Sequence, residues 1–119
     1  MIVAVCTYLF ALFLFVGCVA HIVQPEIFDG FIPGFIPKPL ANGLAAAAEF
    51  VIAAALVLSR TRALGGLMAA ALCLAYMPFH VWDLFRPDPV VAPLWVAMVR
   101  LLLQFVFIWF GLHLWSRGR

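Results

Sequence analysis

Four long apolar segments, separated by short polar stretches, make up most of the chain. They cover about residues 1–23, 40–58, 63–82 and 94–115. Each is close to the ~20 residues that an α-helix needs to cross ~30 Å of hydrocarbon. Lipid offers no hydrogen bonds to an open backbone, so helices are the expected spanning structure, and the short alternating segments of a β-barrel are absent. The pattern predicts an all-α, integral membrane four-helix bundle.

The composition indicates the same class. Hydrophobic residues make up 68% of the 119 residues, and charged residues 10%, whereas a soluble domain is about half apolar and about a quarter charged. So few charged side chains cannot cover a water-facing surface, which excludes a soluble enzyme, a nucleic-acid-binding protein and a disordered tail. Four spans use the whole length, so we expect a single transmembrane domain over residues 1–119.

The basic residues predict how the bundle is oriented. Four spans place both termini and the turn after the second span on one side, and that side carries four basic residues: Arg60, Arg62, Arg117 and Arg119. The other side carries only Lys38 and Arg86. Short cytoplasmic loops are enriched in Lys and Arg, so we expect both termini in the cytoplasm and the protein in the inner (cytoplasmic) membrane. The first segment lacks a basic start and a small-residue cleavage site, so it is expected to remain as a span.

The first loop, residues 24–39, is rich in proline and in large apolar side chains. It contains Pro25, Pro33, Pro37 and Pro39, a spacing that disfavours a regular helix. The loop is also too apolar to extend into water, so we expect it to lie at the membrane interface with its aromatic rings at headgroup depth. Two interpretations remain open, a lid over the outer end of the bundle and a plain interfacial anchor.

Five polar side chains interrupt the apolar segments: His21, Glu49, His80, Arg100 and Gln104. An ionisable group inside a bilayer costs ~2.5–3.5 kcal/mol on insertion scales, so such groups often mark function. By helical rise, Glu49 lies ~13 Å and Arg100 ~10 Å below the outer boundary, with Gln104 one turn deeper. All five fall in the outer half, and every helix contributes at least one.

Glu49 and Arg100 are expected to pair at this depth, because either charge alone would be unstable in hydrocarbon. Alanines beside Glu49, together with Gly65 and Gly66 in the third segment, allow the helices to approach closely. The sequence thus predicts a tight bundle around a polar pocket that opens outward. The alternative is a structural Glu–Arg pair that sets helix register, with the histidines only reaching the interface.

The five polar residues suit a ligand with a carbonyl or anionic group better than a metal. A guanidinium at the same depth would repel a divalent cation, and no helix carries two ligands at metal-binding spacing. Arg100 and Gln104 can donate hydrogen bonds, and His21 or His80 can shuttle protons. A quinone headgroup or a small anion fits; the candidate acid–base residues are Glu49, His21 and His80.

The remaining polar and thiol residues are expected to be structural. Cys6, Cys18 and Cys73 form no Cys-x-x-Cys motif and are interpreted as small apolar fillers, without thiol–disulfide chemistry. Asp83 is expected in water at the end of the third helix, although it could instead orient His80.

The order of these motifs resembles the DoxX-like family of small four-helix membrane proteins. The matching residues are, in chain order, Gly17 with His21, Pro25-Glu26 and the loop through Pro37, Glu49, the turn Leu58–Arg62, Met77–His80 and Arg100–Gln104. The chain has Ser59 and Leu102 where that family often has proline, and His80 where it often has asparagine. By position, the resemblance implies that His21, Glu49, Arg100 and Gln104 form a shared polar set.

The resemblance also implies a function linked to redox chemistry. DoxX-like proteins include subunits of thiosulfate:quinone oxidoreductase, oxidoreductases of thiol or quinone stress and, more remotely, cargo receptors and assembly chaperones. Neither the family nor this chain shows a flavin, haem or nucleotide motif, so a redox role needs a partner or a quinone from the bilayer.

Three functions follow from these observations. The first is a redox-associated subunit that binds a quinone or another carbonyl-bearing or anionic ligand. The second is a non-catalytic scaffold or assembly protein that docks a membrane protein partner or a second copy. The third is an enzyme that performs acid–base chemistry on a hydrophobic substrate.

Overall fold

The structure, a computed structural model, describes residues 1–119, and its regular secondary structure consists of helices alone. Its four long helices are α1 (Ile2–Val23), α3 (Lys38–Val57), α4 (Arg62–Phe85) and α5 (Leu94–Gly118). Each is long and apolar enough to cross a membrane. The prediction of an all-α protein with four spans is confirmed, and the chain is a multi-pass membrane protein.

A fifth, one-turn helix, α2 (Glu26–Asp29), lies in the first loop. The expectation that prolines keep this loop free of helix was wrong for this turn. Pro25 immediately precedes α2 with φ −61°, and proline favours the start of a helix because its φ is already helical and its missing N–H is not needed there. No further proline follows until Pro33, which leaves room for one turn.

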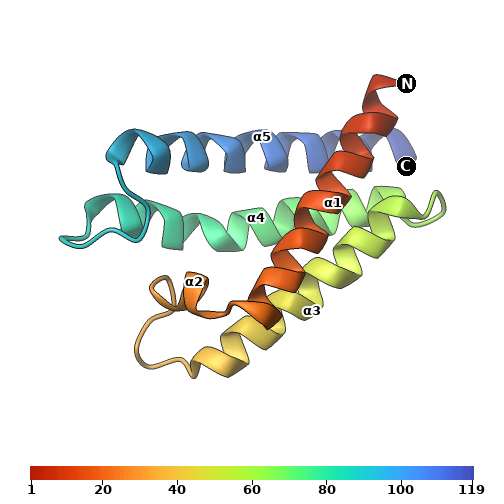
Figure 1. The fold of residues 1–119 in the computed structure, drawn as a ribbon. Coiled ribbons are helices and arrows are strands. Elements are labelled where there is room, and N and C mark those ends of the chain that lie inside the picture. Colours follow the sequence, from red (N-terminus) through yellow and green to blue (C-terminus); the bar gives the residue numbers. More distant parts are fainter.

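The long helices form two antiparallel pairs, α1 with α3 and α4 with α5, and contacts between α3 and α4 join the pairs. Figure 1 shows the α1/α3 pair crossing the α4/α5 pair obliquely. Both termini and the turn between α3 and α4 lie at one end of the molecule. The loops 24–37 and 86–93 lie at the other, which we call the loop end.

Glycines allow α4 and α5 to pack closely. A Cβ atom added at Gly66 would lie 2.6 Å from the carbonyl oxygen of Gly111, and one added at Gly111 would lie 2.5 Å from that of Gly66. No side chain fits at either position without separating the helices, as is usual where membrane helices pack through small residues. Between α1 and α5, the rings of Phe10 and Phe107 stack with centroids 5.0 Å apart.

Candidate functional site

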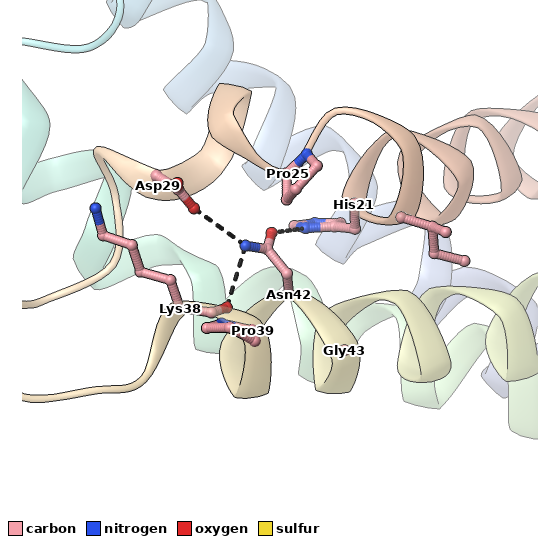
Figure 2. Close-up of a pocket in the computed structure, with 8 residues that line it drawn as sticks. His21, Pro25, Asp29, Lys38, Pro39, Asn42 and Gly43 are labelled. Atoms are coloured by element: carbon pink, nitrogen blue, oxygen red, sulfur yellow. Dashed lines mark hydrogen bonds between the residues drawn. The ribbon is translucent and has the colours of Figure 1, made fainter.

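The polar site begins with His21 near the loop end of α1 (Figure 2). Its Nδ1 lies 2.7 Å from Oδ1 of Asn42 on α3. The Asn42 amide nitrogen donates to Oδ1 of Asp29 at 3.2 Å and to the carbonyl oxygen of Lys38 at 3.1 Å. Because the amide nitrogen has two acceptors, the amide oxygen faces His21, and Nδ1 of His21 carries the proton that it donates. Asn42 thereby orients the imidazole.

The other imidazole nitrogen faces Glu49, which is buried inside the bundle with 6% of its surface exposed. Nε2 of His21 lies 3.8 Å from Oε1 of Glu49, and the hydroxyl of Tyr76 donates to the same oxygen at 3.3 Å. Oε2 of Glu49 has no hydrogen-bond partner. It points at Gly17, where an added Cβ would lie only 2.7 Å away. Glycine at position 17 therefore makes room for the carboxyl group between α1 and α3.

A cavity of about 300 Å³ lies at the loop end of the α1/α3 pair, with His21 in its wall. Its lining residues come from α1, the first loop with α2, and α3: His21, Ile22, Pro25, Asp29, Lys38, Pro39, Asn42 and Gly43. The pocket thus combines a cationic, an anionic, an imidazole and an amide side chain. Phe28 stacks on the His21 ring, with ring centroids 3.7 Å apart, and helps to hold the imidazole in place.

A second polar cluster lies between α4 and α5. The side-chain nitrogen of Gln104 lies 3.2 Å from Nε2 of His80, so the amide donates and the imidazole accepts. Oε1 of Gln104 is buried without a partner. The guanidinium carbon of Arg100 lies 4.7 Å from the centre of the Phe31 ring, and that ring meets His80 edge to face at 5.8 Å. Phe31 therefore covers this cluster from the first loop.

The structure does not form the expected pair between Glu49 and Arg100. No carboxylate oxygen lies within 4.0 Å of the Arg100 guanidinium, and the near partners of Glu49 are His21 and Tyr76. The reason is lateral position, since α3 packs on α1 and α4 whereas α5 packs mainly on α4. Glu49 and Arg100 lie at similar depths along their helices, but the packing of the helices places them in separate clusters.

Asp83 organises the loop end of α4, and the expectation that it lies in water was wrong. It is only 2% exposed, and its carboxylate accepts the backbone N–H groups of Val90 at 2.7 Å and Val91 at 3.0 Å. Arg86 lies 3.8 Å from the same carboxylate and donates to the carbonyl oxygen of Gly30 at 2.6 Å. These contacts tie the loop 86–93 and the first loop to the end of α4.

The first loop thus contacts both polar clusters, through Phe28 on His21 and through Phe31 on Arg100 and His80. Its position is the one that a lid would occupy.

Of the three cysteines, Cys18 and Cys73 are buried and Cys6 is exposed, and all are free. The filler interpretation therefore suits the two buried thiols.

Three members of the site were not predicted from the sequence: Asn42, Asp29 and Tyr76. A signal for Asn42 was present: it is an amide seven residues before Glu49 in the same apolar segment, so both occupy nearly the same helix face. Asp29 was assigned to an interfacial loop, and its contact with Asn42 depends on the path of that loop. Tyr76 carried no signal, because tyrosine in a span is equally compatible with the lipid interface.

Fold and site together define a multi-pass helical membrane protein with a polar pocket at one end. Over residues 9–115 the chain matches the family described as Domain of unknown function (DUF8561), and it belongs to that family. No curated protein and no solved structure matches the chain. The resemblance to DoxX-like proteins stays a prediction.

Proposed function

We propose that this protein is a DoxX-like, redox-associated membrane protein that binds the headgroup of a quinone, or of a similar carbonyl-bearing ligand, in the pocket beside His21. The observation that carries the proposal is the continuity of polar groups from this open pocket to the buried Glu49. His21 belongs to both, since it lines the cavity and lies 3.8 Å from the Glu49 carboxyl group.

The residues around the cavity fit such a headgroup. Lys38 offers an ammonium group that can donate to a carbonyl oxygen or pair with an anion, and Pro25 and Pro39 offer apolar surface. Pockets of this size with a few convergent polar groups are typical of small-molecule sites. A bound quinone would supply the two-electron, two-proton chemistry that the side chains of this chain lack.

His21 and Glu49 would carry protons to and from the pocket. Asn42 holds the proton on Nδ1 of His21, so Nε2 would accept a proton from the Glu49 carboxyl group, directly after a small movement or through one water. The resulting imidazolium would pass its Nδ1 proton to the pocket once the bond to Asn42 opens, which leaves Glu49 as the carboxylate until it is protonated again. Tyr76 orients Oε1 of Glu49. In this proposal His80, Arg100 and Gln104 form a separate group under Phe31 that positions the first loop and does not touch the headgroup.

The loop end faces outward in this proposal, and the protein resides in the cytoplasmic membrane. The support is the distribution of basic residues at the ends of the spans, with four arginines at the opposite end of the bundle and only Lys38 and Arg86 beside the connections at the loop end. Short cytoplasmic loops are enriched in Lys and Arg. Electrons would come from or go to a membrane protein partner, because no redox cofactor motif is present in the chain.

A binding measurement with a short-chain benzoquinone tests the function. The protein is placed in lipid nanodiscs, and His21→Ala and Lys38→Gln are compared with His113→Ala, a histidine that stacks on Trp109 near the other end of α5. Lys38→Gln removes a charged donor, and loss of a hydrogen bond to a charged group costs ~1.5–3 kcal/mol, so this variant should bind ~10-fold to 100-fold more weakly. His21→Ala should also bind more weakly, because it removes the imidazole from the cavity wall. The control should bind like the parent. Equal affinity of all four proteins would contradict the proposal.

A further inference from the structure

A second cavity lies between α1 and α3, nearer the termini. Its volume is about 460 Å³ and its nine lining residues are all hydrophobic: Tyr8, Ala11, Leu12, Phe15, Phe50, Ala53, Ala54, Val57 and Leu58. The polar pocket beside His21 is formed by the same two helices at the loop end. The two cavities therefore share one helix–helix seam.

Residue spacing shows that both cavities open on the same side of this seam. On α1, Tyr8 and Phe15 line the apolar cavity and Ile22 lines the polar pocket, at intervals of seven residues. Seven residues turn a helix through nearly two full turns, so such positions share a face. On α3, Gly43 lines the polar pocket and Phe50 and Val57 line the apolar cavity, again seven apart.

A charged side chain lies beside the far end of the apolar cavity. Arg62, at the start of α4, donates to the Tyr8 hydroxyl at 3.3 Å and to the carbonyl oxygen of Val57 at 3.1 Å. A guanidinium at this point ends the apolar lining. From Ile22 to Tyr8 the seam runs 14 residues, which corresponds to ~21 Å of helix. The seam thus has a polar pocket at the His21 end, an apolar section of limited length, and the charged side chain of Arg62 at its far end.

We propose that the α1/α3 seam holds the isoprenoid tail of the ligand whose headgroup lies beside His21. This inference rests on the proposed function and specifies its ligand as an amphiphile with one hydrocarbon chain. A polar pocket and an apolar cavity on the same side of one seam suit one molecule with a head and a tail. Small side chains, Ala11, Ala53 and Ala54, leave the space for the chain, whereas Phe15 and Phe50 border it.

Filling the apolar cavity tests this inference. Ala54→Phe occupies the cavity without entering the core, because Ala54 is exposed. The matched control is Ala71→Phe, an exposed alanine on α4 that lines neither cavity. Affinities are measured in nanodiscs, as mole fraction of lipid, for one benzoquinone with a long isoprenoid tail and for the same headgroup with a short tail.

The parent and Ala71→Phe should bind the long-tailed quinone about tenfold more tightly than the short-tailed one, through added packing in the seam. Ala54→Phe should lose that preference and keep its affinity for the short-tailed quinone. If the parent binds both quinones equally, or if Ala54→Phe keeps the tail preference, the tail site is refuted while the headgroup site stands. If neither quinone binds the parent, both the tail site and the proposed function are refuted.

Discussion

The buried carboxyl group of Glu49 is accommodated by neutral or titratable neighbours and not by a permanent cation. Tyr76 donates a hydrogen bond to it and His21 lies within 3.8 Å, while Gly17 leaves the volume that its second oxygen occupies. A carboxyl group held this way can gain or lose a proton more easily than one fixed in a buried ion pair with arginine. This arrangement suits proton exchange better than the expected Glu49–Arg100 pair would have done.

A double-mutant cycle on unfolding free energies distinguishes the two arrangements. Glu49→Gln and Arg100→Leu share no partner in the structure, so their effects should add to within ~0.5 kcal/mol. Glu49→Gln and His21→Ala act on groups in contact, so their interaction energy should lie in the range ~0.5–3 kcal/mol. Steric trapping in bicelles measures all the variants. A large coupling between Glu49 and Arg100 would show that they pair in the membrane.

At the scale of elements, two different devices hold α4 and α5 in place. Along their length the helices meet through Gly66 and Gly111, where each backbone approaches the other. At the loop end, the connection between them is held by the Asp83 carboxylate, which accepts two backbone N–H groups of the loop. The first device depends on the absence of side chains and the second on a buried charge, so they respond to different substitutions.

Gly66→Ala should destabilise the bundle. The added methyl group would lie 2.6 Å from the Gly111 carbonyl oxygen, and overpacking of this kind costs ~1–3 kcal/mol. Gly43→Ala is the matched control, because nothing lies within 4 Å of its added Cβ and alanine favours a helix. In mixed micelles, Gly66→Ala should therefore lower the free energy of unfolding, and Gly43→Ala should raise it. Equal stabilities would mean that α4 and α5 are not in close contact.

Asp83→Ala should release the loop 86–93. The amides of Val90 and Val91 lose their carboxylate acceptor, and a hydrogen bond to a charged group contributes ~1.5–3 kcal/mol. Hydrogen exchange at these two amides should accelerate, while exchange in the middle of α5 stays slow. Asp88→Ala, in the exposed part of the same loop, should leave both amides protected. Unchanged protection in Asp83→Ala would assign the loop's order to other contacts.

At the scale of the whole molecule, the helices place both termini at one end and both long loops at the other. The molecule measures 43 × 28 × 19 Å, so its longest dimension is sufficient to cross a ~30 Å hydrocarbon layer. Four arginines gather at the end with the termini, so this end should be cytoplasmic. In this proposed orientation the polar pocket would open to the outer face, and a ligand would enter from the outer leaflet.

Reporter fusions after Arg119 and within the loop 86–93 measure this orientation. A cytoplasm-active reporter should function after Arg119, and an export-dependent reporter should function in the loop. Replacing Arg60 and Arg62 with glutamine should weaken the preference for a cytoplasmic C-terminus, because Lys and Arg near the span ends set the orientation of the bundle. The reverse pattern of activities would place the pocket on the cytoplasmic side.

The hydrophobic pattern by itself determined the class of protein, the number of spans and the approximate helix ends. A helix must bury about twenty residues to cross a bilayer, and this requirement is local and one-dimensional. It also identified His21, Glu49, His80, Arg100 and Gln104 as unusual, because a polar group in a span is costly wherever it lies.

Only the tertiary structure decided which of these polar residues meet. Contact depends on how each helix is rotated about its axis and on which helix it packs against. The depth of a residue along its helix gives no information on either. Glu49 met His21 and Tyr76 because α3 packs on α1 and α4, while Arg100 on α5 met Phe31 of the first loop. The burial of Asp83 likewise depended on a loop that folds back over the helix end.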